Sequence, residues 1–349
     1  MRIAQLGVGR IGTFHAAALH DHADVSELLI ADADPARARE AADRLGAGAR
    51  ALGSVDEVFA PGAVDAVVIT SATAAHADLI RRAARAGLPA FCEKPIALDL
   101  PGTMAALREV ESAGTVLQMG FQRRFDAGYR AAREAVLAGR IGRLHTARAL
   151  TSDMAPPPAE FIPLSGGLYR DCLVHDFDII RWVTGHEITE VYAIGANGGA
   201  DFFREAGDVD TAAVLLTLDG GALATATSTR YNGAGHDVRL ELCGTLDTVA
   251  VGVDCRTPVT SLEPGSAPGV PKPWTGFLER FGPAYRAELA AFVSVVRGEL
   301  ANPCDGRDAL AALLVAEACE VSRHERRPVS VADIAEQAGK LAGGTEIAA

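Results

Sequence analysis

Short apolar runs alternate with longer amphipathic stretches along the first 120 residues. The runs are almost continuously apolar, which is typical of strands in a parallel sheet that is covered on both faces. The pattern predicts strands at 64–69, 88–92 and 115–119, and helices at 35–44, 74–85 and 101–112. Strands and helices in this alternation favour a doubly wound α/β domain.

Beyond about residue 140 the hydrophobic period shortens to two. Apolar and polar positions alternate in 223–229 and 238–242, as in antiparallel strands with one buried face. We therefore expect an α+β domain with a large open, mostly antiparallel sheet. The outward face of 223–229, lined by small and hydroxyl side chains, is either solvated or packed on another subunit.

Further helices are predicted at 166–182, 285–297 and 305–323, where apolar residues recur at helical spacing. Residues 264–273 contain four prolines and two glycines and are predicted to form a loop. With 349 residues, 49% of them apolar, the chain is long enough for two domains that need no disulfide or structural metal.

The first strand leads into the turn Gly7-x-Gly9-x-x-Gly12, and a helix starts near Arg10. Gly7 permits the tight turn, Gly9 lets the backbone approach a pyrophosphate, and Gly12 lets the helix pack closely on the strand. The helix N-terminus directs free N–H groups at the phosphates. Because strand, turn, helix and second strand follow within 32 residues, we predict a Rossmann domain over residues 1–120.

Asp32 ends the second strand, 20 residues after Gly12. A carboxylate at this spacing accepts hydrogen bonds from the adenosine ribose and repels a 2′-phosphate. The next residues, Ala33, Asp34 and Pro35, include no cation, so the sequence favours NAD over NADP as the cofactor. A purely structural glycine turn is the alternative interpretation.

The formal charge is −12 and no run of Lys or Arg occurs, which argues against nucleic acid or an anionic membrane as a partner. The six cysteines have no Cys-x-x-Cys spacing, so they indicate neither a zinc site nor a thioredoxin-type motif. No apolar run has the length of a membrane span, and the first strand begins at the N-terminus. We expect a cytoplasmic protein.

Two further segments carry candidate chemistry. Cys92-Glu93-Lys94-Pro95 stands at the end of a predicted parallel strand, where open α/β sheets bind ligands. Lys94 is either a cation at the nicotinamide end of the cleft or an ordinary surface lysine. Asp171 and His175 are four residues apart and are predicted to share one helix face, which Asp178 continues.

A carboxylate beside a histidine can fix its tautomer and raise its basicity, which suits a general base for an alcohol. Asp171 and His175 are also open to two other interpretations, a surface pair on a helix or half of a metal site. No second histidine-rich segment accompanies them, and we predict no metal.

Taken together, the glycine turn, Glu93-Lys94-Pro95 and Asp171-x-x-x-His175 resemble the glucose–fructose oxidoreductase/inositol dehydrogenase (Gfo/Idh/MocA) family. The resemblance spans nearly the whole chain and gives a second domain over residues 121–335 for substrate binding and oligomerisation. The stretches 120–129 and 274–285 look closest to the inositol 2-dehydrogenase branch.

The resemblance implies NAD-dependent oxidation of a ring hydroxyl of a cyclitol or sugar. Lys94 would contact the reacting hydroxyl and the cofactor, His175 would take the hydroxyl proton, and Asp171 would bind a substrate hydroxyl. Arg124 and Tyr231 resemble substrate-contacting positions. The residues assigned to the cofactor are Gly7, Gly9, Arg10, Ile11, Gly12, Asp32, Ser71, His76, Glu93 and Lys94. Family members commonly form tetramers through the open sheet.

The substrate that the resemblance favours is myo-inositol, oxidised at position 2. The proline-rich segment 151–165 does not align with inositol dehydrogenases and could reshape the pocket, so another inositol isomer or a sugar is an alternative. A non-catalytic NAD-sensing protein on the same fold is the third possibility, although such a protein has no need of Lys94, Asp171 and His175 together.

Overall fold

The computed structural model describes residues 1–266, 269–270 and 272–341. The chain divides into two compact units, each of which is described by itself. The first contains residues 1–122, 283–310 and those from 338 onward, and the second contains 123–282 and 311–337. Three residues of the predicted loop 264–273, at positions 267, 268 and 271, lie outside the described part of the chain.

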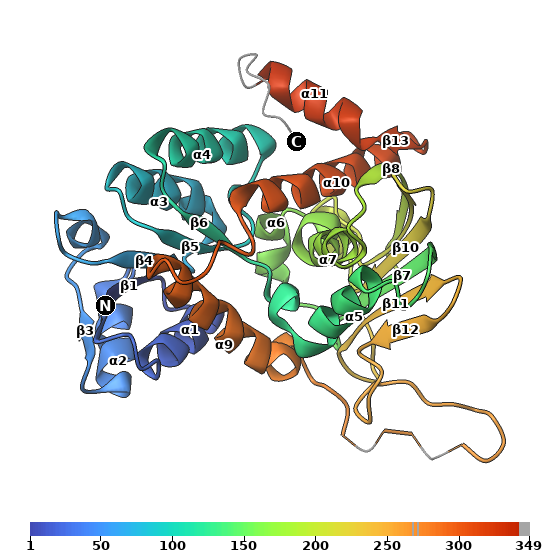
Figure 1. The fold of residues 1–349 in the computed structure, drawn as a ribbon, viewed down its shortest axis with the longest axis horizontal. Coiled ribbons are helices and arrows are strands. Elements are labelled where there is room, and N and C mark those ends of the chain that lie inside the picture. The colour runs from blue at the N-terminus through green and yellow to red at the C-terminus, as the bar shows by residue number, and fades with distance from the viewer. Residues whose placement is uncertain (267–268, 271, 342–349) are drawn as a thin grey trace. The chain divides into compact units, whose positions relative to one another are not determined.

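A six-stranded, all-parallel sheet forms the centre of the first unit, in the order β3-β2-β1-β4-β5-β6 (Figure 1). Its strands are β1 (Arg2–Leu6), β2 (Glu27–Ala31), β3 (Ala49–Ala51), β4 (Ala66–Ile69), β5 (Ala90–Glu93) and β6 (Leu117–Gly120). This is the strand order of a Rossmann domain. Successive strands are added toward one edge of the sheet from β1 to β3 and toward the other edge from β4 to β6. The carboxyl ends of β1 and β4 therefore flank the crevice in which such sheets bind ligands.

Helices cover both faces of this sheet, and their bounds are α1 (Arg10–His20), α2 (Pro35–Leu45), α3 (Thr73–Arg85), α4 (Leu100–Ala113) and α9 (Phe277–Val296). The helices α1, α2 and α9 share one apolar cluster with β1, β2 and β4, to which α9 contributes Leu289, Phe292 and Val293. The central strands β4, β5 and β6 are buried along their whole length and mostly apolar, which agrees with the predicted doubly wound layers.

Most predicted elements of this unit are found within two residues of their expected bounds. Asp34 caps α2, because its Oδ1 accepts a hydrogen bond from the Ala36 N–H at 2.9 Å. The clearest difference is α9, which begins at Phe277 and not at Tyr285, because Pro283 lies inside the helix and does not precede it. The part of α9 from Pro283 onward belongs to the first unit, together with residues up to 310.

The second unit is built on a seven-stranded sheet in the order β12-β11-β7-β10-β9-β8-β13. Its strands are β7 (Leu144–Ser152), β8 (Ile188–Ala196), β9 (Thr211–Leu218), β10 (Leu223–Thr229), β11 (Asp237–Gly244), β12 (Thr248–Val251) and β13 (Val329–Ser330). Among the described strands of this second sheet, only the pair β7 and β10 is parallel, so the sheet is mostly antiparallel, as predicted.

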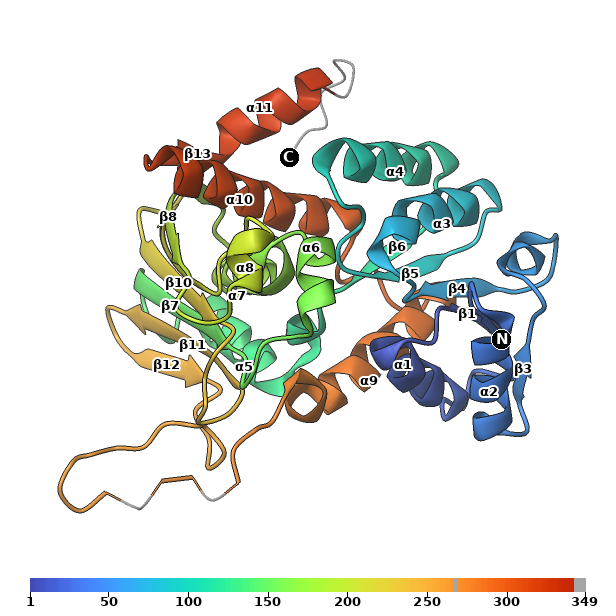
Figure 2. The ribbon, with the colours of Figure 1, turned by 180° about the vertical axis from the view of Figure 1, so that it is seen from behind.

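One face of the second sheet is covered by α5 (Ala127–Leu137) and α7 (Val174–Thr184), as Figures 1 and 2 show, and α10 (Gly306–Glu325) completes the helices of this layer. In β10, Ala224, Ala226 and Ser228 are buried, and the residues between them point to the other face. On that other face Ile194, Leu215 and Leu223 are 53%, 59% and 58% exposed. This group, from three neighbouring strands, is named the open face below.

The region 166–182 is not the single α-helix that its spacing predicts. A π-helical turn, Tyr169–Leu173, precedes α7, which begins at Val174. A π-turn inserts one extra residue, so positions four apart no longer lie directly above one another, and such turns are frequent at functional sites. Upstream lies the short α6 (Ile162–Ser165), and α8 (Phe202–Glu205) and α11 (Val331–Leu341) are the remaining α-helices of the described chain.

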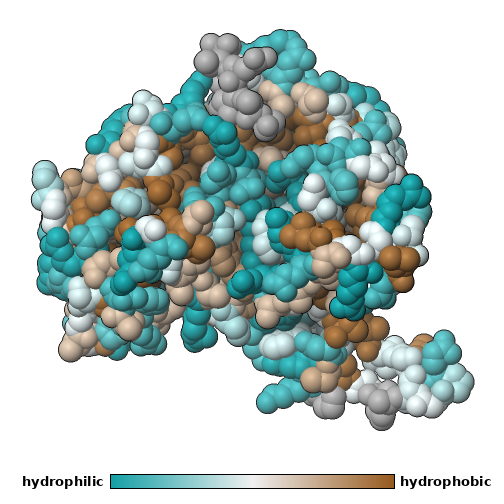
Figure 3. All heavy atoms as spheres, in the orientation of Figure 1, coloured by the Kyte–Doolittle hydropathy of each residue, from teal (hydrophilic) through white to brown (hydrophobic). Residues whose placement is uncertain are grey.

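Apolar residues on the face shown in Figure 3 occur in groups separated by hydrophilic ones. Among the helices in the described ranges, none combines the length and the hydrophobicity needed to cross a membrane. All six cysteines are present as free thiols, and four of them are buried, as is typical of core cysteines.

Candidate active site

The glycine turn follows β1 and has the geometry that its sequence predicts. Gly7 has φ +95°, and a Cβ there would lie 2.6 Å from the Cα of Ser71. A Cβ on Gly12 would overlap the carbonyl oxygen of Gly7. Apart from the residues next to Gly9 in the chain, no described residue has an atom within 4 Å of a Cβ at this position, so the backbone there is accessible to a pyrophosphate.

Buried hydrogen bonds hold this turn in place. The Gly7 carbonyl accepts from the Thr70 hydroxyl at 2.8 Å and from the Gln5 amide at 3.0 Å, and the Gly7 N–H donates to the Ala31 carbonyl at 2.8 Å. Gln5 and Thr70 also hydrogen-bond to each other. The turn is therefore fixed by β1, β2 and β4 together, which preorganises the first N–H groups of α1 for an anion.

Asp32 follows β2 and lies beside the same turn. Its Oδ2 accepts from the Val8 N–H at 2.9 Å, and its Oδ1 accepts from the Asp34 N–H at 3.0 Å. No cation follows Asp32 directly in the sequence, but the structure brings Arg37 back to this position. Its guanidinium donates to the Val8 carbonyl at 3.2 Å, across the same residue that Asp32 contacts.

His76 in α3 connects two loops of the proposed cofactor site. Its Nδ1 lies 2.8 Å from the carbonyl oxygen of Pro95, and its Nε2 lies 3.0 Å from that of Ser71. Burial lowers the pKa of His76, while the two hydrogen bonds to carbonyls act in the opposite direction. The imidazole thus joins the end of β4 to the Glu93-Lys94-Pro95 segment after β5.

In the second unit, the structure adds partners to Asp171 that sequence spacing did not reveal. Arg230, only 3% exposed, donates to Asp171 at 2.7 Å and to Asp153 at 3.1 Å. His236 is also buried, and its Nδ1 lies 3.4 Å from the other oxygen of Asp153. Asp171 thus belongs to a network of two acids, an arginine and a histidine from four segments.

Burial by itself would raise the pKa of Asp153. The hydrogen bond from His236 and the positive charge of Arg230 outweigh burial and lower that pKa below its usual value. Arg230 lies between the two carboxylates, and their charges raise its pKa despite its burial. Arg230 is therefore the shared cationic partner of Asp153 and Asp171.

Asp178 lies three residues after His175 in α7. It is buried and forms a bidentate pair with Arg124, with distances of 2.6 and 3.0 Å. The neighbouring Arg123 pairs with Asp176 at 2.6 Å, and Asp176 also accepts from the Thr151 hydroxyl at 2.7 Å. A buried arginine needs a carboxylate partner. Arg123 and Arg124 find theirs on α7, so these two pairs join α7 to the segment before α5.

The remaining predicted residues lie in separate surroundings. His175 is partly buried in the first turn of α7. Tyr231 is 39% exposed after β10, and its hydroxyl accepts a hydrogen bond from the Ala200 N–H at 3.0 Å. The first unit brings together Gly7, Gly12, Asp32, Ser71 and His76 around the ends of its strands. Lys94 follows β5 in that unit, whereas Asp171 and His175 belong to the second.

Two family models match this chain. Residues 1–121 match "Oxidoreductase family, NAD-binding Rossmann fold", and residues 129–250 match "GFO/IDH/MocA C-terminal domain". The chain belongs to the GFO/IDH/MocA oxidoreductase family. Its first unit is therefore an NAD-binding Rossmann domain, and the residues present fit that cofactor: a glycine turn open at Gly9 and an acid at the end of β2.

Individual relatives extend over almost the full length. An inositol 2-dehydrogenase of Rhizobium meliloti is 37% identical, with 95% of this chain and 99% of that protein covered. The scyllo-inositol 2-dehydrogenase (NAD(+)) of Bacillus subtilis is 37% identical, covering 85% and 86%. A solved structure of scyllo-inositol dehydrogenase from Lactobacillus casei with NAD(H) and scyllo-inositol has TM-score 0.83 at 30% identity, covering 95% and 99%.

Proposed function

We propose that this protein is an NAD-dependent dehydrogenase that oxidises one ring hydroxyl of a cyclitol to a ketone, with myo-inositol as its substrate and position 2 as the site of oxidation. The observation that carries the proposal is the combination of the NAD-binding unit with Lys94, Asp171 and His175 in a chain whose full-length relatives are named inositol dehydrogenases.

In this mechanism Lys94 donates a hydrogen bond to the carbinol oxygen and stabilises the negative charge that develops there. His175 takes the hydroxyl proton as general base. Bound NAD supplies the acceptor for the hydride that leaves the same carbon. The proton and the hydride together account for the two hydrogens lost when the alcohol becomes a ketone.

Asp171 has the role of binding a neighbouring substrate hydroxyl, and Arg230 supports that role because its hydrogen bond holds the carboxylate in place. Tyr231 and Arg124 are proposed as further substrate contacts. Arg124 already uses two donors on Asp178, so we expect it to act from a rigid position and not as a mobile clamp.

Cofactor contacts are proposed for Gly7, Gly9, Arg10, Ile11, Gly12, Asp32, Ser71, His76, Glu93 and Lys94. Asp32 would accept hydrogen bonds from the adenosine ribose, and the N-terminus of α1 would face the pyrophosphate. His76 would keep the loops after β4 and β5 in register, since it bonds to both Ser71 and Pro95.

A second candidate substrate is scyllo-inositol, because relatives of similar identity carry that name. The two inositols differ in the orientation of one hydroxyl, so the contacts around Asp171 and the segment 151–165 would decide between them. A shape change in this segment alters which hydroxyl faces the base, while the chemistry at Lys94 and His175 stays the same.

The open face is proposed to be the subunit interface of a homotetramer. Ile194, Leu215 and Leu223 from neighbouring strands are exposed there, and such a group of apolar side chains is stabilised by burial against a second copy. Light scattering on the wild type and on Leu215→Lys tests this, because a buried lysine would dissociate the assembly.

We also propose that the protein is located in the cytoplasm, where its free cysteines stay reduced.

The deciding experiment measures NAD reduction by absorbance with myo-inositol, scyllo-inositol, D-chiro-inositol, glucose and xylose, in parallel with NADP. We expect turnover of myo-inositol with NAD. Lys94→Ala and His175→Ala should each lower kcat by about 10²–10⁴-fold while NAD binding is nearly unchanged. Turnover of another polyol and not of myo-inositol would keep the proposed chemistry but change the substrate that we assign. NAD binding without any turnover would favour a non-catalytic sensor.

A further inference from the structure

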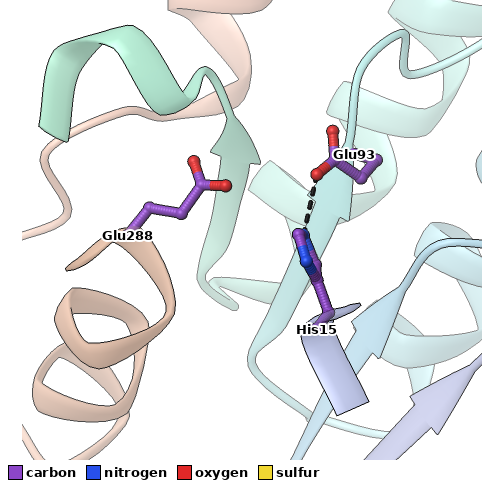
Figure 4. A group of neighbouring side chains, drawn as sticks. All are labelled: His15, Glu93 and Glu288. Carbon is purple, nitrogen blue, oxygen red and sulfur yellow. Dashed lines mark hydrogen bonds and ion pairs between the residues drawn. The ribbon is translucent and has the colours of Figure 1, made fainter. Parts of the chain in front are cut away.

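Three acid–base side chains meet inside the first unit, beside the Glu93-Lys94-Pro95 segment. They are His15 in α1, Glu93 at the end of β5 and Glu288 in α9, and Figure 4 shows them converging from three elements. His15 and Glu288 are fully buried, and Glu93 is 9% exposed. One candidate ligand atom from each lies within 4.8 Å of those of the other two.

The carboxylate of Glu93 is held from two sides. Its Oε1 lies 2.8 Å from Nε2 of His15. Its other oxygen packs against Gly120 on β6, where a Cβ would come within 2.9 Å of it, so a larger residue opposite Glu93 would displace this carboxylate. The orientation of Glu93 is thus fixed immediately before Lys94.

The surroundings of this cluster have a low polarity. The imidazole of His15 lies edge-on to Phe91 and tilted against Tyr285, with ring centroids 5.7 Å away in both cases. Phe91 in turn contacts Phe292. In such surroundings charges are weakly screened, and two neighbouring carboxylates strongly disfavour simultaneous ionisation.

Glu288 is anchored by its backbone and not by its carboxyl group. Its carbonyl oxygen accepts a hydrogen bond from the buried side chain of Gln118 at 3.0 Å. Neither carboxyl oxygen has a hydrogen-bond partner among the described residues, although both are buried. An ionised carboxylate in this position would be a second negative charge beside Glu93 without a cation of its own.

We propose that Glu288 is a neutral carboxylic acid and a positioning residue. It gives the His15–Glu93 pair a polar but uncharged neighbour within 4.8 Å, and this keeps the Glu93 carboxylate, and with it the backbone that presents Lys94, in place. The catalytic role of Lys94 rests on the proposed function, whereas the effect of Glu288 on the position of Lys94 is independent of it. Burial raises the pKa of Glu288, and the negative charge of Glu93 raises it further, in agreement with the neutral form.

A divalent cation is the competing explanation, because one histidine and two carboxylates are a common donor set. The geometry favours the proton. His15 and Glu93 already lie at hydrogen-bond distance, 2.8 Å, and both atoms would have to separate to bind a common ion. The experiment below distinguishes the two, since glutamine replaces a neutral acid well but a metal-bound carboxylate poorly.

The first test uses Glu288→Gln, which keeps the shape and neutrality of the acid, and Glu288→Leu, which removes its polar end. The chain has three lysines, Lys94, Lys272 and Lys340, so competitive amine labelling followed by mass spectrometry reports on Lys94 with two internal controls. We expect unchanged Lys94 labelling in Glu288→Gln and a change of several-fold in Glu288→Leu, with Lys272 and Lys340 unaffected in both.

Activity, once the substrate is established, gives the parallel readout. We expect kcat of Glu288→Gln to lie within about twofold of wild type. The kcat of Glu288→Leu should be at least about tenfold lower than wild type, which corresponds to about 1.4 kcal/mol in activation free energy. The glycine turn and Asp32 are intact in both variants, so any change in the KM for NAD should be smaller than the change in kcat. An absence of wild-type turnover would overturn the proposed function alone, while the labelling still decides the inference.

The second test compares thermal unfolding of wild type and Glu288→Gln from pH 5 to 8. A carboxyl group whose folded pKa is raised above the ordinary value of 4.5 stabilises the protein below that value and loses this contribution as pH rises. Wild type should therefore lose stability relative to Glu288→Gln as pH increases. His15 and Glu93 are the titratable neighbours, present in both proteins, and Glu205→Gln, at an exposed site, is the matched control.

Three results would overturn the inference. The first is an equal change of Lys94 labelling in Glu288→Gln and Glu288→Leu. The second is a stability difference that does not depend on pH. The third is one equivalent of Zn²⁺ or Mn²⁺ in the purified wild type by elemental analysis, lost in Glu288→Gln, which would make the cluster a metal site.

Discussion

Replacing Arg230 by leucine tests how the second unit holds Asp171. The substitution removes both hydrogen bonds of the guanidinium, at 2.7 Å to Asp171 and 3.1 Å to Asp153, and leaves two carboxylates facing each other. Leucine fits most of the volume of the arginine stem, so the main loss is electrostatic and not a cavity.

The magnitude follows from the burial of the three groups. Arg230 is 4% exposed in its side chain, and the carboxylates of Asp153 and Asp171 are 24% and 18% exposed. Breaking a buried ion pair from one side costs about 3–5 kcal/mol. Because water reaches part of both carboxylates and His236 remains beside Asp153, we expect the lower end, about 3 kcal/mol.

The pH dependence has a defined sign. The pKa of Asp153 is lowered in the folded protein, so its contribution to stability is present above its unfolded pKa and is lost as pH falls through the folded pKa. At acid pH the carboxylates of the variant also become neutral and no longer repel each other. The stability difference between wild type and Arg230→Leu should therefore shrink toward pH 4.

The assay is urea-induced unfolding of both proteins at pH 7 and pH 4, with kcat measured in parallel. Asp153→Asn is the control, since it removes one charge and should cost less than Arg230→Leu. We expect kcat of Arg230→Leu to fall by at least about tenfold, because Asp171 loses the partner that orients it. A cost under 1 kcal/mol at pH 7, or an equal cost at both pH values, would refute the reasoning.

Two further predictions concern the nucleotide turn. Asp32→Ser removes the charge that repels a 2′-phosphate while Arg37 stays beside Val8, so the ratio of kcat/KM for NADP to that for NAD should rise by about 10- to 100-fold. The double variant with Arg37→Ala should lose most of this gain, and an unchanged ratio in Asp32→Ser would contradict the assignment of the acid. Gly12→Ala forces a Cβ onto the Gly7 carbonyl, so we expect a loss of about 1–3 kcal/mol in unfolding free energy and weaker NAD binding by calorimetry. Gly46→Ala, in open space after α2 but with positive φ, is a control that should lower stability without affecting NAD affinity.

The sequence by itself determined the nucleotide-binding half of this protein. The glycine turn, the helix after it and Asp32 lie within 32 consecutive residues, so their arrangement follows from local backbone geometry and strand spacing. The apolar runs likewise predicted a parallel sheet, and the alternation in 223–229 predicted the open antiparallel one, because periodicity reports which faces are buried. Family membership followed from short motifs of the same local kind.

Only the tertiary structure decided which distant residues pair. Arg230 lies 59 residues from Asp171, and Glu288 lies far along the chain from both His15 and Glu93. A buried charge selects its partner by position in the fold, which no spacing in the sequence encodes. For the same reason a uniform period of 3.6 predicted neither the π-turn before α7 nor the pairing of Asp178 with Arg124.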